Sequence, residues 1–155
     1  MRVILQRVSD ASISIHGELV TSIGVGLVVL LGVSIHDTDD DSRYIVNKIL
    51  NIRIFPDDRG HFNLSAMDVG ADLLVVSQFT LYANTRKGRR PDFTRAAPPQ
   101  MAELAYERVL ELLKESYLKV RSGCFQEFMT VRLANQGPAT IVLDSSDRLT
   151  PRRKE

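Results

Sequence analysis

The sequence is most apolar in the stretch Gly26-Leu27-Val28-Val29-Leu30-Leu31-Gly32-Val33. Apolar side chains at consecutive positions, with a glycine near each end, are typical of a β-strand that is buried on both faces. The wider apolar run from Ile23 to Ile35 stays well short of the roughly 20 residues that a helix needs to cross a bilayer. The stretch therefore predicts a strand in the core of a globular domain.

The segments that flank this strand also have β patterns. Residues Val3–Val8 are rich in β-branched and apolar side chains, and Ser and Ile alternate in Ser12–Ile15. A turn at residues 16–18 would join Ser12–Ile15 to Leu19–Ile23 as a hairpin. Further along, Asp72–Leu81 has the composition of a second buried strand.

Shorter strands are predicted in the middle and at the end of the chain. Ile52–Phe55 is a short candidate that ends at a turn beginning with Pro56. The last two candidates are Phe128–Ala134 and Ala139–Leu143, which Asn135-Gln136-Gly137-Pro138 would separate.

Two helices are predicted. The acidic segment 37–41 precedes apolar residues at helical spacing, and carboxylates in a first turn favour the positive end of the helix dipole. Pro98 and Pro99 open the second helix, whose apolar stripe consists of Ala102, Ala105, Tyr106, Val109, Leu112 and Leu113. We expect an α+β fold, a largely antiparallel sheet or barrel with two helices in a single domain over residues 1–144, followed by a frayed charged tail at 145–155.

The composition excludes several classes of protein. The chain has 155 residues, of which 44% are hydrophobic and 25% charged, and its net charge of +1 excludes a histone-like polycation. The single cysteine, Cys124, cannot form an internal disulfide or a multi-cysteine zinc site. The N-terminus becomes polar too soon for a signal peptide. We expect a cytoplasmic protein in a reducing compartment.

An acidic cluster resembles a calcium loop but does not complete the motif. Asp37, Asp39 and Asp41 have the spacing of the first ligands. Ser42 and Lys48 then stand where the loop needs Gly and Glu. Helix capping explains these carboxylates better, and no metal is predicted.

Other catalytic motifs are also missing. The three histidines are scattered, and none has a metal-ligating partner at useful spacing. Ser77 lacks the Gly-x-Ser-x-Gly elbow of α/β-hydrolases. No cofactor is predicted.

Three segments contain residues that the packing of the fold alone does not explain. The strand Val76–Leu81 contains the polar residues Ser77, Gln78 and Thr80, which form either a wet face or the wall of a cavity. The segment Asn135–Thr140 is either a tight turn or a backbone device in which a cis Gly–Pro bond aims two carbonyls the same way.

The third segment is a basic loop. Arg86, Lys87, Arg89 and Arg90 are close together in a polar, proline-containing stretch from Thr85 to Pro99. These cations are either simply solvated or contact phosphates.

Together these segments resemble the D-aminoacyl-tRNA deacylase family. The resemblance is carried by Ser77-Gln78-Phe79-Thr80-Leu81, Gly88-Arg89-Arg90-Pro91-Asp92-Phe93 and Asn135-x-Gly137-Pro138-x-Thr140, in that order, and it covers about residues 1–144. Two positions depart from the family. Gln126-Glu127-Phe128 are bulkier than the residues the family commonly has there, and Gln136 replaces the family's usual Asp.

The resemblance implies an esterase that hydrolyses D-aminoacyl-tRNA, and mischarged glycyl-tRNA as well, without a cofactor. The family is homodimeric, and its Gly-cisPro element reaches into the partner's pocket. Gly137 and Pro138 would place carbonyls where an L side chain would go, so that L substrates are excluded sterically.

The resemblance also assigns site residues. Ser77, Gln78, Phe79 and Thr80 would be catalytic, with the backbone N–H groups of Phe79 and Thr80 as oxyanion donors and the tRNA's own 2′-hydroxyl assisting water. Thr80 as a covalent nucleophile is the lesser alternative. The remaining contacts, to adenosine and to tRNA phosphates, would come from Phe125, Met129, Arg86, Lys87, Arg89 and Arg90.

Alternatives from other classes remain open. A non-catalytic RNA-binding module would keep the basic loop but would deacylate nothing. A cofactor-free hydrolase would cleave small esters without RNA. Some synthetase editing modules share the implied fold, but we expect this chain to be a freestanding enzyme.

Overall fold

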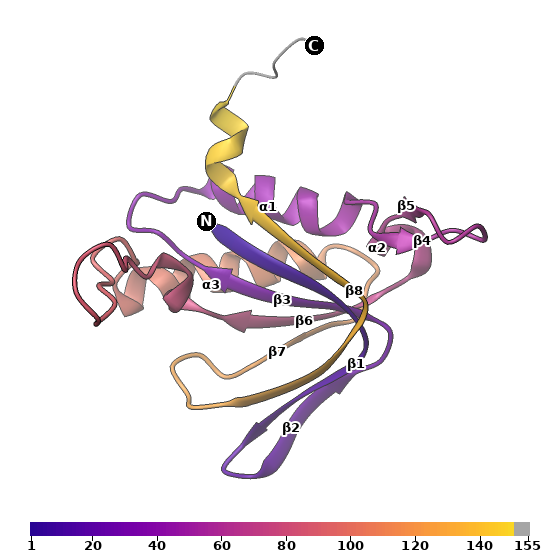
Figure 1. Ribbon diagram of the computed structural model, residues 1–155, viewed down its shortest axis with the longest axis horizontal. Helices are drawn as coiled ribbons and strands as arrows, with labels where there is room; N and C mark the ends of the chain where they lie inside the picture. The colour runs from indigo at the N-terminus through magenta and orange to yellow at the C-terminus, as the bar shows by residue number, and fades with distance from the viewer. Residues whose placement is uncertain (151–155) are drawn as a thin grey trace.

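One long strand organises the structure. The computed structural model describes residues 1–150, in which β1 (Arg2–Ile15) pairs along one edge with β8 (Thr130–Asp144). Its other edge pairs first with β3 (Gly26–Gly32) and then with β2 (Glu18–Ile23), and all three pairings are antiparallel. The hairpin predicted between β1 and β2 is confirmed. Figure 1 shows β1 and β8 side by side across the front of the sheet.

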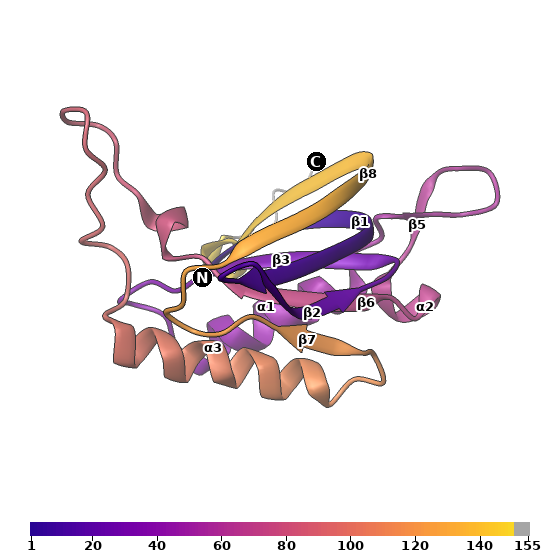
Figure 2. The ribbon, with the colours of Figure 1, turned by 90° about the horizontal axis from the view of Figure 1, so that it is seen from below.

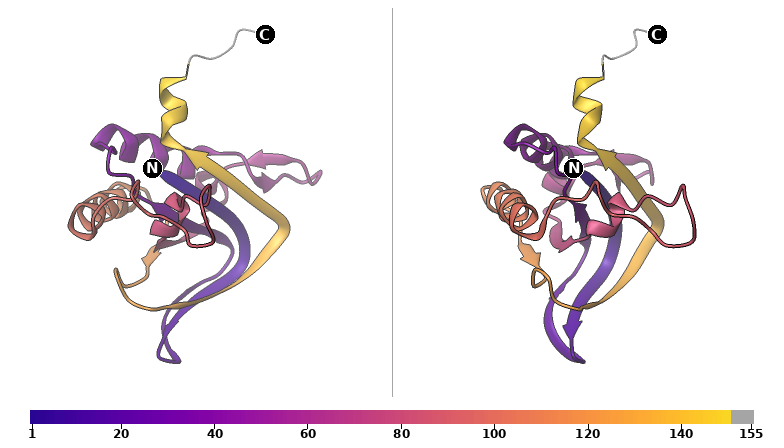
Figure 3. Two further views of the ribbon diagram at one scale, coloured as in Figure 1. Left: turned by 60° about the vertical axis from the view of Figure 1, so that its left-hand side comes forward. Right: turned by 90° about the vertical axis from the view of Figure 1, so that its left-hand side faces the viewer.

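The other elements complete a curved sheet with helices against it. The remaining strands are β4 (Phe55–Pro56), β5 (Phe62–Leu64), β6 (Asp72–Ser77) and β7 (Val120–Ser122). The helices are α1 (Asp39–Asn51), α2 (Ala66–Val69) and α3 (Pro99–Lys114), with two 3-10 helices, η1 (Phe79–Tyr82) and η2 (Ser145–Leu149). The main sheet has the order β2-β1-β3-β6-β7, with β8 on β1, and curls into a nearly closed barrel (Figure 3).

The predicted core strand is confirmed, and its two faces enter different clusters. Leu27, Val29 and Leu31 face a core that the sheet shares with α1 and α3. Val28 faces a second cluster, inside the curl of the sheet, with residues of β1 and β6. Because side chains alternate along a strand, a strand buried on both sides must be apolar throughout.

The prediction of a largely antiparallel sheet is only partly correct. β6 joins β3 in parallel, and β7 joins β6 in parallel. Parallel neighbours need long crossover connections, and here the connections contain α1 and α3. These two helices pack side by side on one face of the sheet (Figure 2).

The helix prediction missed one element. The structure has three α-helices rather than two, because α2 is a single turn and too short to show a periodic pattern. The acidic start of α1 is confirmed as a capping box, in which Thr38 and Asp41 satisfy each other's backbone groups. No helix within residues 1–150 has the length and apolarity that crossing a bilayer requires.

Four predicted strands have different bounds. The two strands predicted at Phe128–Ala134 and Ala139–Leu143 are one continuous strand, β8, with Gly137 and Pro138 inside it rather than in a turn. Asp72–Leu81 is a strand only to Ser77, and Ile52–Phe55 contributes only Phe55 to β4. Gly and Pro suggested a loop, but neighbouring β1 pairs with β8 on both sides of them.

The tail predicted to be frayed is ordered where the structure describes it. Residues 145–149 form η2, Ser145 is buried, and Arg148 Nε lies 3.1 Å from Asp41 Oδ1. The prediction was therefore wrong for this segment, because Arg148 pairs with Asp41 of α1 and Ser145 is buried. Residues 151–155 of that tail lie outside the described residues.

We expect Asp41→Asn to weaken this junction. Burial alone would raise the pKa of Asp41, but hydrogen bonds from Arg148 and Thr38 outweigh it and hold the pKa well below its usual range. The charged form therefore stabilises the fold above pH 4, and this contribution is lost as the pH falls towards the lowered pKa. The free energy of unfolding should drop by about 1–3 kcal/mol at pH 7, a loss that shrinks below about pH 4.

Urea denaturation at pH 7 and at a pH below about 4 measures this effect. Asp40→Asn is the matched control, because the Asp40 side chain is exposed and makes no hydrogen bond within residues 1–150. Equal losses for the two variants would contradict the role given to Asp41.

Candidate active site

The candidate catalytic residues lie where β6 ends. Gln78 N–H still donates to the Leu31 carbonyl at 2.8 Å, as the neighbouring strand would require. The first hydrogen bond of η1 runs from Leu81 N–H to the Gln78 carbonyl, at 3.2 Å. The N–H groups of Phe79 and Thr80 therefore precede the hydrogen-bonded turn, and helical geometry leaves such first donors without a helical acceptor.

The polar side chains of this turn interact with each other. Gln78 Nε2 donates a hydrogen bond to Thr80 Oγ1. No imidazole, amine or carboxylate hydrogen-bonds to Thr80 Oγ1 within residues 1–150. The pairing orients the threonine hydroxyl but supplies no base that would make it a nucleophile.

A cavity of about 590 Å³ opens beside this turn. It brings together four of the predicted site residues: Ser77, Phe79, Phe125 and Met129. The rest of its lining is Phe93, Ala96, Ala97, Pro98, Pro99, Ala102, Gln126 and Glu127. Of the three polar residues predicted on this segment, Ser77 lines the cavity, whereas Gln78 and Thr80 do not.

Tyr106 of α3 supports this wall from behind. Burial raises the pKa of the Tyr106 phenol, which keeps it neutral, and its hydroxyl donates to the Val75 carbonyl at 2.9 Å. Its ring packs against Phe125, with 5.8 Å between ring centroids. One buried side chain thus ties α3 to β6 and to the Phe125 side of the cavity.

Glu127 is the only ionisable residue that lines the cavity within residues 1–150. It lies on the bulky segment Gln126-Glu127-Phe128, in which Gln126 has a positive φ of 62°. Both side chains are exposed at the rim. No three His, Cys, Asp or Glu side chains of the described residues are grouped to hold a metal ion.

Gly137 and Pro138 do not line the cavity of their own chain. They are exposed on β8, and the peptide bond between them is cis. Gly137 has a φ of 120°, and a Cβ added there would lie 2.5 Å from an Arg7 guanidinium nitrogen. Glycine is favoured at this position, because the backbone conformation would strain an L residue and a Cβ would require the Arg7 guanidinium to shift.

Arg7 holds this segment from β1, and sequence reasoning missed it. Its Nε donates to the Gln136 carbonyl at 3.1 Å and its Nη1 to the Ile54 carbonyl at 2.5 Å. Its guanidinium lies 5.1 Å from the centre of the Phe62 ring, and only 7% of the residue is exposed. The sequence did contain an indication of it. Alternation along β1 places Arg7 on the same inward face as Val3 and Leu5, where a buried charge is costly unless other groups compensate it.

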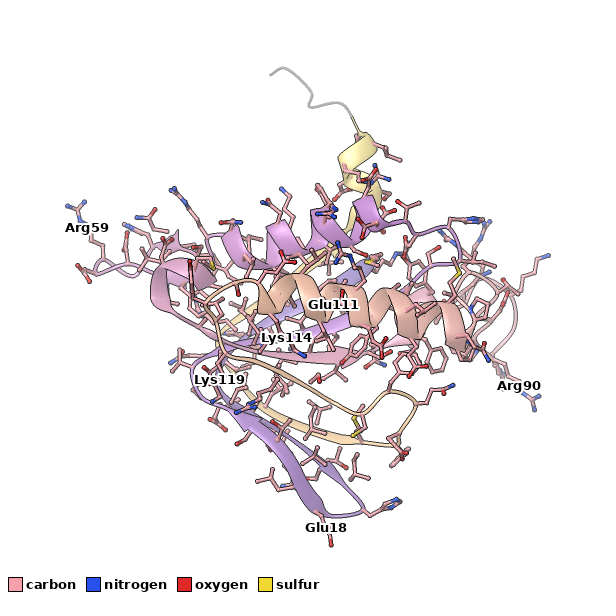
Figure 4. The ribbon with its side chains drawn as sticks, turned by 180° about the vertical axis from the view of Figure 1, so that it is seen from behind. Glu18, Arg59, Arg90, Glu111, Lys114 and Lys119 are labelled. Carbon is pink, nitrogen blue, oxygen red and sulfur yellow. The ribbon has the colours of Figure 1, made fainter. Side chains whose placement is uncertain are left out.

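The basic loop stands apart from the cavity. Arg86, Lys87, Arg89 and Arg90 are all exposed, and none forms an ion pair within the described part of the chain. Figure 2 shows the loop extending away from the body, and Figure 4 shows Arg90 pointing outward from it. These cations are free to meet an external anion.

Comparison with known proteins places these features in one family. A relative from Dehalococcoides mccartyi, named D-aminoacyl-tRNA deacylase, is 51% identical over 152 residues, which cover 98% of this chain and 99% of the relative. A relative of the same name from Carboxydothermus hydrogenoformans is 47% identical over 144 residues, covering 93% and 99%.

Two solved structures share the fold. A protein described as "c-Myc DNA Unwinding Element Binding Protein" has a TM-score of 0.89 and 42% identity, covering 93% of this chain and 98% of its own. A "probable eukaryotic D-amino acid tRNA deacylase" has a TM-score of 0.77 and 21% identity, covering 92% and 97%.

The sequence model of one family, described as D-Tyr-tRNA(Tyr) deacylase, matches residues 4–144. This range includes the turn after β6, the cavity, the basic loop and the Gly137–Pro138 segment. The chain therefore belongs to the D-Tyr-tRNA(Tyr) deacylase family.

Proposed function

We propose that this protein hydrolyses the ester between a D-amino acid and the terminal adenosine of tRNA, and releases both. The observation that carries the proposal is the cavity at the end of β6, which gathers Ser77, Phe79, Phe125 and Met129 beside two N–H groups that η1 does not use. Relatives about half identical over nearly the whole chain are named for this reaction. A cytoplasmic location follows from this substrate.

In the proposed reaction, the oxygen of a water molecule attacks the ester carbonyl. The carbonyl oxygen becomes an oxyanion that accepts hydrogen bonds from the N–H groups of Phe79 and Thr80. The bond to the ribose oxygen then breaks, and that oxygen takes a proton as the amino acid leaves. Loss of one such oxyanion donor costs about 2.7–4 kcal/mol in enzymes of known mechanism.

The 2′-hydroxyl of the terminal ribose relays the proton in this scheme: its oxygen accepts a proton from the attacking water, and its own proton passes to the departing ribose oxygen, so the hydroxyl is regenerated. Support comes from the lining of the cavity. Within the described part of the chain, Glu127 is the only ionisable residue in that lining, and its side chain is exposed at the rim. Thr80 has only Gln78 as its hydrogen-bond partner, and an amide is not a base. Water assisted by the RNA therefore fits this site better than a threonine nucleophile.

Stereochemical selection is assigned to Gly137 and Pro138 of a second copy of the chain. These residues are exposed and do not reach the cavity of their own chain, so only another molecule can bring them there. The outer face of β8 also leaves Val142 70% exposed, which suits burial against a partner. Two main-chain carbonyls in the cavity would occupy the space of an L side chain, and glycine would pass because it has none.

The basic loop would bind tRNA phosphates. Four unpaired cations on an exposed loop suit a contact that neutralises phosphates and releases counterions. A non-catalytic nucleic-acid-binding role is the second candidate, because a similar structure is described as a DNA unwinding element binding protein. The same loop would serve both roles, so an assay of hydrolysis must decide between them.

We expect the purified protein to hydrolyse D-tyrosyl-tRNA at least about a hundredfold faster than L-tyrosyl-tRNA. Glycyl-tRNA should also be hydrolysed, because it has no side chain to exclude. Release of labelled amino acid measures all three reactions. Binding of tRNA without any release would favour the non-catalytic role, and cleavage of small esters with no tRNA reaction would favour a general esterase.

We further expect the chemistry to depend on the RNA hydroxyl rather than on Thr80. Thr80→Ala should lower kcat by less than about tenfold, because the alanine keeps the backbone N–H. A tRNA with a 2′-deoxy terminal adenosine should lose at least about a hundredfold in kcat but still bind, since general acid–base assistance contributes about 10²–10⁴.

Single-turnover rates and binding of both tRNAs measure this difference. Glu127→Gln is the matched control, and it should leave kcat within about threefold if this carboxylate is not the base. Full loss of activity in a folded Thr80→Ala protein, with normal rates on the deoxy substrate, would restore threonine as the nucleophile.

A further inference from the structure

The basic loop is closed at its base by a pair of backbone hydrogen bonds. Asn84 N–H donates to the Asp92 carbonyl at 2.7 Å, and Asp92 N–H donates back to the Asn84 carbonyl at 3.0 Å. The Asn84 side chain accepts from Arg86 N–H, and the Asp92 side chain accepts from Thr94 N–H. Residues 85–91 therefore form a closed loop on a firm base, and this loop contains all four cations.

Both ends of this base connect to the candidate catalytic turn. On one side, Ala83 N–H donates to the Thr80 carbonyl at 3.0 Å, so Asn84 follows directly on η1. On the other side, the Phe93 ring meets the Phe79 ring edge to face, with 5.0 Å between centroids and 67° between planes. The loop base is thus connected to η1 by the chain at one end and by a ring contact at the other.

Phe93 lies between two surfaces that would meet different parts of one substrate. Its ring and that of Phe79 both line the cavity. The loop of residues 85–91, on the other side of Asp92, is exposed and extends from the body (Figure 3). Edge-to-face aromatic pairs have a preferred geometry, so the position of one ring restricts the other. The N–H groups proposed as oxyanion donors belong to Phe79 and its neighbour.

From this geometry we infer that Phe93 is a positioning residue that couples tRNA contact at the basic loop to the orientation of η1. The inference rests on the proposed function and extends it. RNA bound at the cations fixes the loop base, the loop base fixes Phe93, and Phe93 fixes the Phe79 backbone against the ester. The tRNA body then raises kcat as well as affinity.

The test compares two substrates, D-tyrosyl-tRNA and D-tyrosyl-adenosine, which share the ester but not the RNA body. For the unmodified protein, kcat should be at least about tenfold higher with the tRNA, since misplacement of reacting groups by about 1 Å costs up to about 10²-fold. In Phe93→Leu this excess, the ratio of kcat on the two substrates, should fall to within about threefold. Phe93→Tyr keeps the ring edge and should restore the excess.

Two further variants keep the test decisive. Arg89→Gln combined with Arg90→Gln changes only exposed side chains, and it should raise KM for tRNA and also lower the kcat excess. Tyr117→Leu removes an aromatic ring that is 98% exposed and does not line the cavity, and it should change neither substrate's kcat.

The outcomes separate the two proposals. If the unmodified protein hydrolyses D-tyrosyl-tRNA but shows no kcat excess over D-tyrosyl-adenosine, or keeps the excess in Phe93→Leu, the coupling is refuted and the proposed function stands. If it hydrolyses neither substrate, the proposed function falls and the coupling with it.

Discussion

The buried guanidinium of Arg7 is the constraint on which the arrangement of β8 depends. A charge that is only 7% exposed needs compensation, and no carboxylate forms an ion pair with it in the described chain. Carbonyls of Gln136 and Ile54 and the face of Phe62 compensate it instead. Because those groups come from β8 and from the segment around β4 and β5, Arg7 joins three parts of the chain at one point. A Cβ at position 137 would require its guanidinium to shift.

The same sheet places the cavity and the Gly137–Pro138 segment on different surfaces of one chain. β1 carries β8 on one edge and β3 on the other, and β3 in turn carries β6, whose end forms the cavity wall. Burial of β3 and β6 on both faces makes this framework rigid, since packed cores do not deform continuously. The proposed function uses both surfaces. The cavity of one chain would bind the ester, and the exposed main chain of another copy would exclude L-amino acids from it.

Much of the fold could be predicted from the sequence, because burial leaves a clear pattern. The run through Leu27 and Val29 predicted a strand buried on both faces, and the stripe through Val109 predicted the long helix. The continuity of β8 could not be predicted, since Gly and Pro usually signal turns and only pairing with β1 reveals the strand. Of the predicted site residues, Ser77, Phe79, Phe125 and Met129 line one cavity, and Gln78 and Thr80 do not. The contacts of Phe93 with Phe79 and of Arg7 with Gln136 join residues that are distant in sequence, so no local pattern indicates them.

The central claim is that a fixed stretch of main chain, rather than side-chain recognition, selects the D-amino acid. Its most direct test is the ratio of kcat/KM for D-tyrosyl-tRNA over L-tyrosyl-tRNA in Arg7→Lys, because lysine keeps the charge but cannot reproduce the two-sided hold of a guanidinium. Arg132→Lys, at an exposed position of β8, is the control. The account predicts that the ratio falls by about tenfold or more in Arg7→Lys alone; an unchanged ratio in a protein whose Gln136–Arg7 hydrogen bond has been lost would contradict it.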